Sequence, residues 1–273
     1  MSDERAIGVF DSGIGGLTVM HELVRRLPNE SIIYFGDTAR VPYGAKSPAT
    51  VARYAQEAAA FLLSRDVKMI VIACNTATAH AQQRLAAALS VPVFGVIEPG
   101  ARAAVQVTST MRIGVIGTVG TIASGAYDLA VRRQLHDARV YAQPCPLFVP
   151  LVEEGWRDHG AARQIAEEYL APLREMDVDV LILGCTHYPL LRHLIADVMG
   201  EHVRLVDSAT ETAIDVQQAL DSFGLRRMSD EAPGYTFTAS DSPLRFRDVG
   251  RQFIGELLKV VELVDVEGCG RAA

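Results

Sequence analysis

The stretch MIVIACNTAT (69–78) is an apolar run that stops at a cysteine and continues into small polar residues. A second stretch, VLILGCTHYPL (180–190), repeats this plan around Cys185. A short, continuously apolar run of this kind is typical of a strand that is buried on both faces of a parallel sheet. The two stretches therefore predict two buried strands, each ending at a cysteine beside the start of a helix.

The repetition extends outward from these strands. AIGVFDSGIGGL (6–17) aligns with RIGVIGTVGTIA (112–123), and each reads as a strand, a turn and the start of a helix. Around them, short apolar runs alternate with amphipathic stretches, as in parallel sheets that helices cover on both faces. A duplication of this length predicts an α/β protein with two similar parallel-sheet domains, related by pseudo-twofold symmetry, and an active site in the cleft between them.

The domain boundaries follow from the place where the alternation of expected strands and helices begins a second time. We expect residues 1–98 and 208–273 to form the first domain and residues 99–207 to form the second. The C-terminal tail breaks the repetition with a polar loop, a strand at 234–240 and an amphipathic helix at 244–261. We expect this tail to pack back on the first domain.

The composition is that of a globular protein with a large core. The chain has 273 residues, of which 49% are hydrophobic and 22% charged, and its net charge of -7 argues against a general nucleic-acid binder. The N-terminus lacks the pattern of a signal peptide, and no apolar run approaches the roughly 20 residues of a membrane helix. We therefore expect a cytoplasmic protein with no nucleic-acid or membrane partner.

The four cysteines are Cys74, Cys145, Cys185 and Cys269, which lie far apart and form no CxxC pair. This spacing argues against a zinc site, so we expect no metal. A cysteine that ends an apolar strand is ordinarily a packing residue, which is our reading of Cys145, while Cys269 is a tail thiol. The duplicated positions of Cys74 and Cys185, both followed by polar residues, favour a functional pair instead.

Two thiols at the carboxyl ends of strands suggest one reaction. Ligands of open parallel sheets bind at that edge, so Cys74 and Cys185 would approach one ligand from opposite sides. The adjacent helix starts would lower the pKa of both thiols and bind carboxylates. This arrangement favours a two-base racemase or epimerase, in which one thiol removes a proton from a carbon and the other returns one from behind.

The sequence also bears on cofactors. A pyridoxal enzyme needs a lysine at the site, but Lys46, Lys68 and Lys259 fall in expected loop or surface positions. We therefore expect a reaction without a cofactor, supported by acid/base helpers and by hydrogen-bond donors.

Candidate helpers stand near both thiols. Asp11 ends the first strand and could hydrogen-bond Cys74, whereas His187 lies two residues after Cys185 and could assist it. The adjacent acids Glu153 and Glu154 follow an apolar segment that could carry a carboxylate to Cys185, and the residues alone do not choose between them. Further donors are offered by Ser12, the Tyr43-Gly44 pair, Thr118 and Thr121.

The turn DSGIGG (11–16) also invites a dinucleotide-binding interpretation, with Asp37 as the ribose-binding acid. However, Thr18 occupies the third glycine position, and Asp11 would repel a pyrophosphate. We therefore favour the racemase over a dinucleotide-binding protein.

Six blocks occur in an order that matches one family: FDSGIGGLTV (10–19), GDTARVPYG (36–44), ACNTATA (73–79), GVIGTVGTIASGAY (114–127), PLFVPLVEEG (146–155) and LGCTHYPLL (183–191). Together they resemble the glutamate racemases of the cofactor-independent aspartate/glutamate racemase superfamily. The resemblance runs from about residue 6 to about residue 210. The tail is only loosely similar.

The resemblance implies interconversion of L- and D-glutamate, supplying D-glutamate for peptidoglycan, by a homodimer without pyridoxal, metal or nucleotide. It implies that Cys74 works on the D enantiomer with help from Asp11. It implies equally that Cys185 works on the L enantiomer with help from Glu153 and His187. The substrate-binding positions that it implies are Asp11, Ser12, Tyr43, Gly44, Asn75, Thr76, Thr121, Thr186 and His187.

Three other functions stay open at this point. The first is a racemase of aspartate or a related acidic amino acid on the same scaffold. The second is a cysteine hydrolase, with Cys185 as nucleophile and His187 as base, which would have no need of Cys74. The third is a two-lobed binding module, which would have no use for two thiols.

Overall fold

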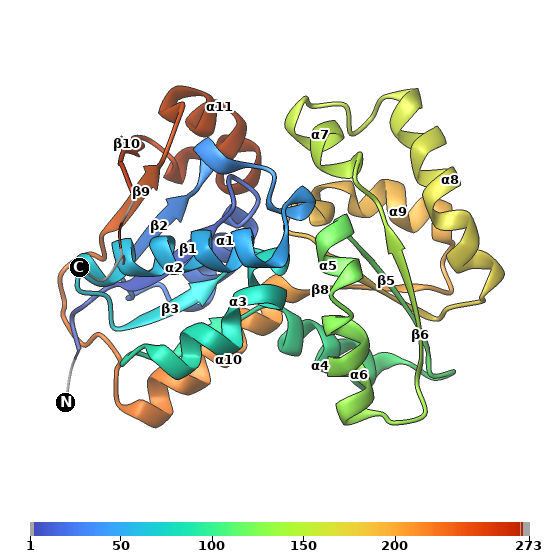
Figure 1. Ribbon diagram of the computed structural model, residues 1–273, viewed down its shortest axis with the longest axis horizontal. Coiled ribbons are helices and arrows are strands. Elements are labelled where there is room, and N and C mark those ends of the chain that lie inside the picture. Colours follow the sequence, from blue (N-terminus) through green and yellow to red (C-terminus); the bar gives the residue numbers. More distant parts are fainter. Residues whose placement is uncertain (1–2, 268, 270–273) are drawn as a thin grey trace.

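The computed structural model describes residues 3–267 and residue 269. Two parallel sheets, each covered by helices, lie side by side (Figure 1). We call the six-stranded sheet with its helices the first lobe, and the four-stranded sheet with its helices the second lobe. The predicted fold class is confirmed. Residues 1–2, 268 and 270–273 of the expected first domain lie outside the described residues.

The two sheets share one strand order. The first sheet contains β1 (Ile7–Asp11), β2 (Ile32–Gly36), β3 (Met69–Ile72), β4 (Val93–Gly95), β9 (Tyr235–Ala239) and β10 (Glu262–Leu263). The second contains β5 (Arg112–Gly117), β6 (Arg139–Pro144), β7 (Val180–Gly184) and β8 (Arg204–Asp207). Their orders are β10-β9-β2-β1-β3-β4 and β6-β5-β7-β8, so β2-β1-β3-β4 recurs in the second lobe. The order reverses between β1 and β3 and between β5 and β7, where open sheets bind ligands.

Helices cover both faces of each sheet. Those of the first lobe are α1 (Leu17–Arg26), α2 (Pro48–Ser64), α3 (Asn75–Ala88), α10 (Ser208–Phe223) and α11 (Pro243–Ile254). Those of the second are α4 (Ile97–Val107), α5 (Val119–Ala123), α6 (Ala126–Gln134), α7 (Phe148–Glu153), α8 (Gly160–Glu175) and α9 (Arg192–Met199). Short 3-10 turns are η1 (Thr38–Arg40), η2 (Tyr43–Ala45), η3 (Tyr188–Leu191) and η4 (Gly255–Leu257). No helix within the described residues is long and apolar enough to span a bilayer.

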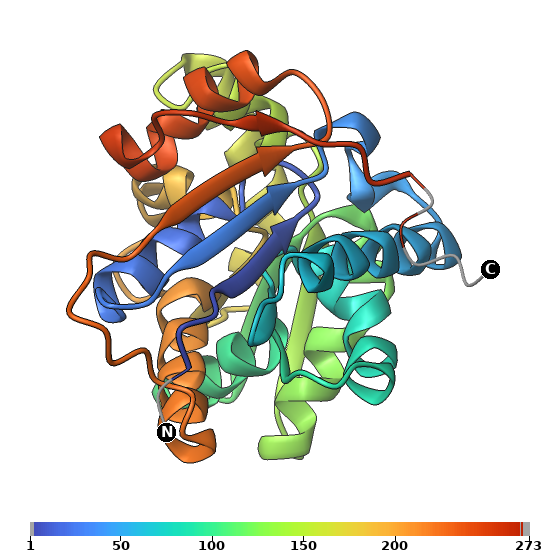
Figure 2. The same cartoon turned by 90° about the vertical axis from the view of Figure 1, so that its left-hand side faces the viewer.

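The strand β3 shows why its sequence is apolar at every position. Met69 and Val71 belong to the core under α1, α10 and α11, whereas Ile70 and Ile72 belong to the core under α2 and α3. Side chains alternate between the faces of a strand, and both faces are covered here, so no polar position remains. Figure 2, which looks onto the first lobe, shows its strands between these layers of helices.

The structure differs from the sequence-based expectations in two places: helices stand at the expected domain crossings, and the tail helix ends earlier than expected. Residues 97–107 and 208–223, where the sequence suggested domain crossings, form α4 and α10. Both lie along the lower side of Figure 1, where the lobes join, and they pack against each other. The tail helix ends at Ile254 and not near residue 261, because Gly255 takes a left-handed φ of 64° and a 3-10 turn follows. The tail strand β9 pairs in parallel with β2.

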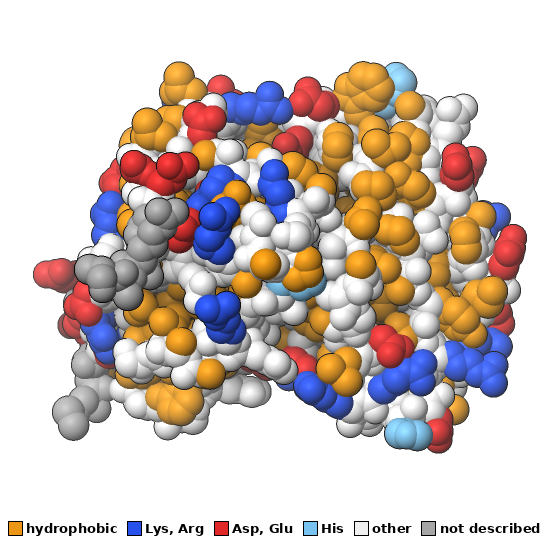
Figure 3. Space-filling model, viewed as in Figure 1, with side chains coloured by type: hydrophobic (Ala, Val, Ile, Leu, Met, Phe, Trp, Pro, Cys, Tyr) orange, Lys and Arg blue, Asp and Glu red, His pale blue; other side chains and the backbone are white. Residues whose placement is uncertain are grey.

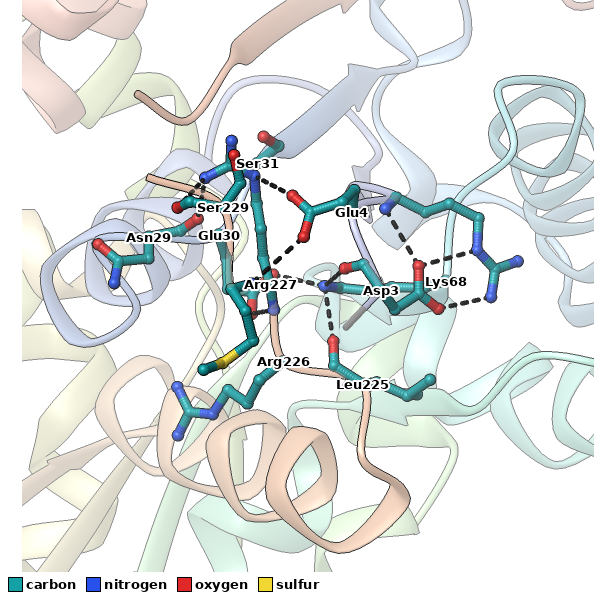
Figure 4. A network of polar contacts seen from close by, with 12 residues as sticks. Asp3, Glu4, Asn29, Glu30, Ser31, Lys68, Leu225, Arg226, Arg227 and Ser229 are labelled. Carbon is teal, nitrogen blue, oxygen red and sulfur yellow. Dashed lines mark hydrogen bonds and ion pairs between the residues drawn. The ribbon is translucent and has the colours of Figure 1, made fainter. Parts of the chain in front are cut away.

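A buried polar network ties the N-terminal segment and the segment that follows α10 to the first lobe (Figure 4). Lys68, expected at a loop or surface position, is 1% exposed, and its Nζ lies 2.6 Å from Glu30 Oε2. Lys68 Nζ also donates to the carbonyls of Asp3 and Leu225, both at 2.8 Å, and the Arg227 N–H donates to Glu30 at 3.0 Å. Removing one partner would leave a buried charge uncompensated, so this network fixes where the chain after α10 returns toward β9.

Candidate active site

The carboxyl ends of both sheets face one cavity of about 340 Å³. Each lobe contributes one cysteine to its lining. The predicted site residues that line it are Ser12, Tyr43, Gly44, Cys74, Asn75, Thr76, Glu153, Cys185, Thr186 and His187. Asp11 and Thr121, which the sequence also predicts, are not part of the lining and stand directly behind it. The sequence therefore predicted which residues gather at the cavity, but it did not separate those that line the cavity from those that stand behind the lining.

On the first lobe, Cys74 ends the apolar run and forms the N-cap of α3. Its sulfur accepts the Ala77 N–H at 3.4 Å and donates to Ser12 Oγ at 3.6 Å. Asp11 is buried at the end of β1, where Oδ2 accepts the Gly13 N–H at 3.0 Å and Oδ1 has no hydrogen-bond partner among the described residues. Asp11 therefore acts on Cys74 here as a nearby charge, and the hydrogen bond expected between them goes to Ser12 instead.

The pKa of Cys74 contradicts the expectation that a helix start lowers it. Burial, and then the charge of Asp11, raise the pKa of this thiol to about 12, against the opposing effects of Ala77 and Ser12. Burial also raises the pKa of Asp11. The expectation failed because the loss of water around a fully buried sulfur outweighs a single weak N–H contact. Cys74 is consequently a neutral thiol at pH 7.

On the second lobe, Cys185 follows β7 and precedes η3. Its Sγ lies 3.9 Å from His187 Nδ1, and His187 Nε2 lies 2.9 Å from Glu153 Oε1. Glu153 is the last residue of α7, so this helix carries the carboxylate to the ring, and His187 is only 6% exposed. The structure thus brings together the sulfur, imidazole and carboxylate that the sequence proposed as one group.

The charge of His187 follows from its two neighbours. Burial alone would lower the pKa of His187, but its hydrogen bonds to Cys185 and Glu153 and their charges raise it to about 10. Burial acts to raise the pKa of Glu153, yet the hydrogen bond and charge of His187 lower it overall. At pH 7 this side of the cavity therefore holds an imidazolium backed by a carboxylate.

Three threonine hydroxyls join the lobes at the cavity wall. Thr76 of α3 lies 2.9 Å from Thr118 and 3.0 Å from Thr121, and the two partners lie 3.0 Å apart. Thr118 lines the cavity, whereas Thr121 stands behind it. Thr118 aligns with Ser12 in the duplicated sequence, and this alignment is the signal that marks it as a lining residue.

Close approaches at two glycines hold the lobes together around the cavity. A Cβ at Gly15 would lie 2.3 Å from Thr186 Oγ1 and 2.4 Å from His187 Nδ1, and a Cβ at Gly44 would lie 2.5 Å from the Thr118 side chain. At Gly15 the DSGIGG turn therefore packs against the second lobe, and this glycine is not free for the close backbone approach of a pyrophosphate that the dinucleotide interpretation requires. Any side chain at these glycines would push the lobes apart.

The η2 turn presents Tyr43 to the cavity in a fixed orientation. Tyr43 is 1% exposed, and its hydroxyl donates to the buried carboxylate of Asp37, which also pairs with Arg40 at 2.7 Å. Burial, and then Asp37, raise the pKa of Tyr43 well above its ordinary value. Since its hydroxyl is committed to Asp37, Tyr43 can offer a ligand only its backbone and ring.

The mouth of the cavity is apolar and its floor is polar. Val41 and Val119 line the cavity and are 47% and 51% exposed. Pro146, Val149 and Pro150, which the sequence did not single out, complete this wall. Figure 3 shows hydrophobic side chains gathered over the second lobe in the view of Figure 1. Such a mouth excludes water from the polar groups below it.

One ion pair crosses between the lobes near the mouth. Arg245 of α11 pairs with Glu154, beside the helix α7, at 2.9 Å. Both side chains are more than half exposed, so the pair contributes little to stability.

The remaining cysteines stand apart from the cavity. Cys145 is buried, and burial raises the pKa of its thiol, while Cys269 is partly exposed. All four cysteines are free. Within residues 3–267 and 269, no three His, Cys, Asp or Glu side chains are grouped as a metal site would need.

Comparisons with known proteins match this arrangement. Residues 7–215 match the Asp/Glu/Hydantoin racemase family. A glutamate racemase of Geobacter metallireducens is 54% identical over 263 residues, which cover 96% of this chain and 97% of that protein.

Solved structures agree in fold along nearly the whole chain. A glutamate racemase isoform of Bacillus anthracis superposes with a TM-score of 0.93 at 42% identity, covering 96% of this chain and 98% of that one. The glutamate racemase of Francisella tularensis in complex with D-glutamate superposes with a TM-score of 0.91 at 40% identity, covering 97% and 99%. The chain therefore belongs to the Asp/Glu/hydantoin racemase family.

Proposed function

We propose that this protein is a glutamate racemase, which interconverts L- and D-glutamate by a cofactor-independent reaction of two opposed cysteines. The observation that carries the proposal is that Cys74 and Cys185, from duplicated strands of different lobes, line one cavity with different acid/base groups behind them. The relatives named above support glutamate as substrate, because they are glutamate racemases at 40% to 54% identity.

The neutral thiol at Cys74 and the positive charge of His187 beside Cys185 suit L-glutamate as the first substrate. The Cys185 thiolate, beside the His187 imidazolium, takes the α-proton of L-glutamate, so that its S–H bond forms as the C–H bond breaks. The electron pair stays on the α-carbon next to the carboxylate. The neutral Cys74 thiol then protonates the opposite face, which leaves a Cys74 thiolate and D-glutamate.

The enzyme must then exchange the protons of its two thiols. Once the product has left, water entering the cavity can take the proton of Cys185, whose thiolate the His187 imidazolium and its Glu153 partner stabilise. The nearby Asp11 carboxyl can pass a proton back to the Cys74 thiolate. D-glutamate reacts by the same steps in reverse.

The polar floor supplies the groups that would hold the substrate. Asn75, Thr76, Thr118 and Thr186 present hydroxyl and amide donors to the cavity. Donors fixed in a water-poor site stabilise the negative charge that develops on a substrate carboxylate as the α-proton leaves. We propose that Ser12 and the backbone of Tyr43 and Gly44 bind the second carboxylate.

Incubation with each enantiomer of glutamate and of aspartate, followed by chiral chromatography, tests the proposal. We expect L- and D-glutamate to reach the same equimolar mixture, because enantiomers have equal free energy, and aspartate to react far more slowly. Faster conversion of aspartate would favour the related racemase, and no conversion of glutamate would reject the proposal. If the protein were a cysteine hydrolase, Cys74→Ser would leave its activity intact.

We further propose the setting that the family resemblance implies. The protein would act in the cytoplasm as a homodimer and supply D-glutamate for peptidoglycan. The expected domains, residues 1–98 with 208–273 and residues 99–207, would move as the two bodies that close on the substrate. Rescue of a bacterial strain that needs external D-glutamate tests this setting, and light scattering tests the dimer.

A further inference from the structure

A tyrosine outside the cavity connects the loops that carry both cysteines. Tyr127 of α6 is 3% exposed and is not part of the cavity lining. Its hydroxyl donates to Asn75 Oδ1 at 2.7 Å and lies 3.2 Å from Ser208 Oγ. Asn75 follows Cys74 at the start of α3, and Ser208 begins α10, so the contact joins elements of both lobes.

Two glycines make room for this contact. A Cβ at Gly184, the residue before Cys185, would lie 3.0 Å from the Tyr127 ring. A Cβ at Gly100 of α4 would lie 2.4 Å from Ser208 Oγ. The ring thus packs against the backbone beside one thiol, while its hydroxyl reaches the residue beside the other.

Counting protons fixes the direction of the hydrogen bonds. A phenol has one proton, which Tyr127 gives to the carbonyl oxygen of Asn75, so the Ser208 hydroxyl donates to Tyr127. Burial raises the pKa of Tyr127, which keeps this donor protonated at any physiological pH. Since the oxygen of the Asn75 amide is committed to Tyr127, its NH₂ group remains for the cavity that Asn75 lines.

We propose that Tyr127, supported by Ser208, is a positioning residue that holds the Asn75 amide with its NH₂ group toward a substrate carboxylate. In the flipped orientation Asn75 would donate to Tyr127 and would present its carbonyl oxygen to the carboxylate, which repels it. This inference rests on the proposed function, because it assigns Asn75 to substrate binding. Tyr127 itself touches no substrate and acts through Asn75.

Tyr127→Phe removes only the hydroxyl and tests the inference. We expect the KM for both enantiomers of glutamate to rise about five- to tenfold, while kcat changes less than about twofold, because a ground-state contact is weakened. The matched control is Thr212→Val, which deletes another buried hydroxyl of the same region, one that donates to the Ser208 carbonyl at 2.6 Å. Thr212→Val should lower the melting temperature and leave KM unchanged.

A double-mutant cycle separates positioning from a general structural effect. If Tyr127 acts through Asn75, Tyr127→Phe should raise KM in the wild type and should add nothing in an Asn75→Ala background. An unchanged KM in Tyr127→Phe, or an equal rise in both backgrounds, would overturn the inference. Both results presuppose that the wild type racemises glutamate. A wild type without this activity would overturn the proposed function, and this inference with it.

Discussion

The Cys74 and Cys185 sides of the cavity share a backbone plan, but the titratable group nearest each thiol differs in sign, an acid beside Cys74 and a base beside Cys185. Both cysteines follow the third strand of a repeated β2-β1-β3-β4 order. In the aligned halves, however, Asp11 corresponds to Gly117 and His187 corresponds to Thr76. A carboxylate from the neighbouring strand therefore stands behind the first thiol, whereas an imidazolium from its own loop stands beside the second.

A duplicated backbone therefore need not give two chemically equivalent sites. A two-base racemase needs one thiol and one thiolate at the same moment, and two identical surroundings would favour the same protonation on both sides. The neutral thiol at Cys74 and the positive charge beside Cys185 separate the two roles.

Replacing either cysteine should have the largest effect. We expect Cys74→Ser and Cys185→Ser each to reduce racemisation at least about 1,000-fold, because a serine hydroxyl loses its proton far less readily than a thiol. Chiral chromatography of glutamate after long incubation measures both losses. A variant that keeps more than about a tenth of the wild-type rate would show that one thiol suffices.

Replacing the helpers should separate the two sides. We expect Asp11→Asn and His187→Asn each to reduce kcat/KM about 100-fold, and equally for both enantiomers, because the equilibrium constant between enantiomers is one. The primary isotope effect on kcat/KM should nevertheless diverge. It should grow for α-deuterated D-glutamate in Asp11→Asn and for α-deuterated L-glutamate in His187→Asn, since each change slows proton transfer at its own cysteine. Identical isotope effects in the two variants would contradict the assignment of helpers to sides.

The contact between Glu153 and His187 predicts that the free energy of unfolding depends on pH through the Cys185 side of the cavity. In Glu153→Gln the pKa of His187 should fall below its value of about 10, because Gln keeps a hydrogen-bond acceptor without the charge. Since the folded-state pKa exceeds the unfolded value of about 6.5, this contact stabilises the fold fully below pH 6.5 and is lost as the pH rises toward 10. The wild type should therefore lose unfolding free energy relative to Glu153→Gln across that window.

Nuclear magnetic resonance of labelled histidine, with urea unfolding at several pH values, measures both effects. The matched control is Glu154→Gln, which changes the next residue and does not contact His187 in the described residues. Titration of His187 near pH 6.5 in the wild type would remove the basis of this prediction.

The ion pair at the cavity mouth should matter least. Arg245→Ala removes an exposed pair between the lobes, and pairs of this kind contribute about 0.2–1 kcal/mol. We expect kcat/KM to change less than about threefold and the small change to vanish at 0.5 M salt. A change above tenfold would show that the mouth, and not the two thiols, controls the rate.

The apolar strands and both cysteines were predictable because burial on two faces leaves a continuous hydrophobic run, as in β3. The positions of Ser12, Asn75 and Thr186 followed from their place beside those strand ends. The family blocks added Glu153, whose place on α7 no periodicity showed.

Other features depend on tertiary contacts that no local pattern encodes. The raised pKa of Cys74 required knowing that the sulfur is fully buried, and the helix start gave the wrong sign. Thr118 lines the cavity and its hydroxyl contacts that of Thr121, which therefore stands behind the lining. Tyr127 reaches Asn75 across 52 positions of sequence, so only the fold brings them together.

The most direct test of two opposed bases is the fate of the α-hydrogen in D₂O during the first few per cent of reaction from L-glutamate. Mass spectrometry of the separated enantiomers reports it. If Cys185 removes one hydrogen and Cys74 donates another, newly formed D-glutamate carries deuterium at the α-carbon while the remaining L-glutamate keeps its protium. Product that retains the substrate's own hydrogen, or L-glutamate that gains deuterium as fast as product forms, would show a single base and contradict the two-base mechanism.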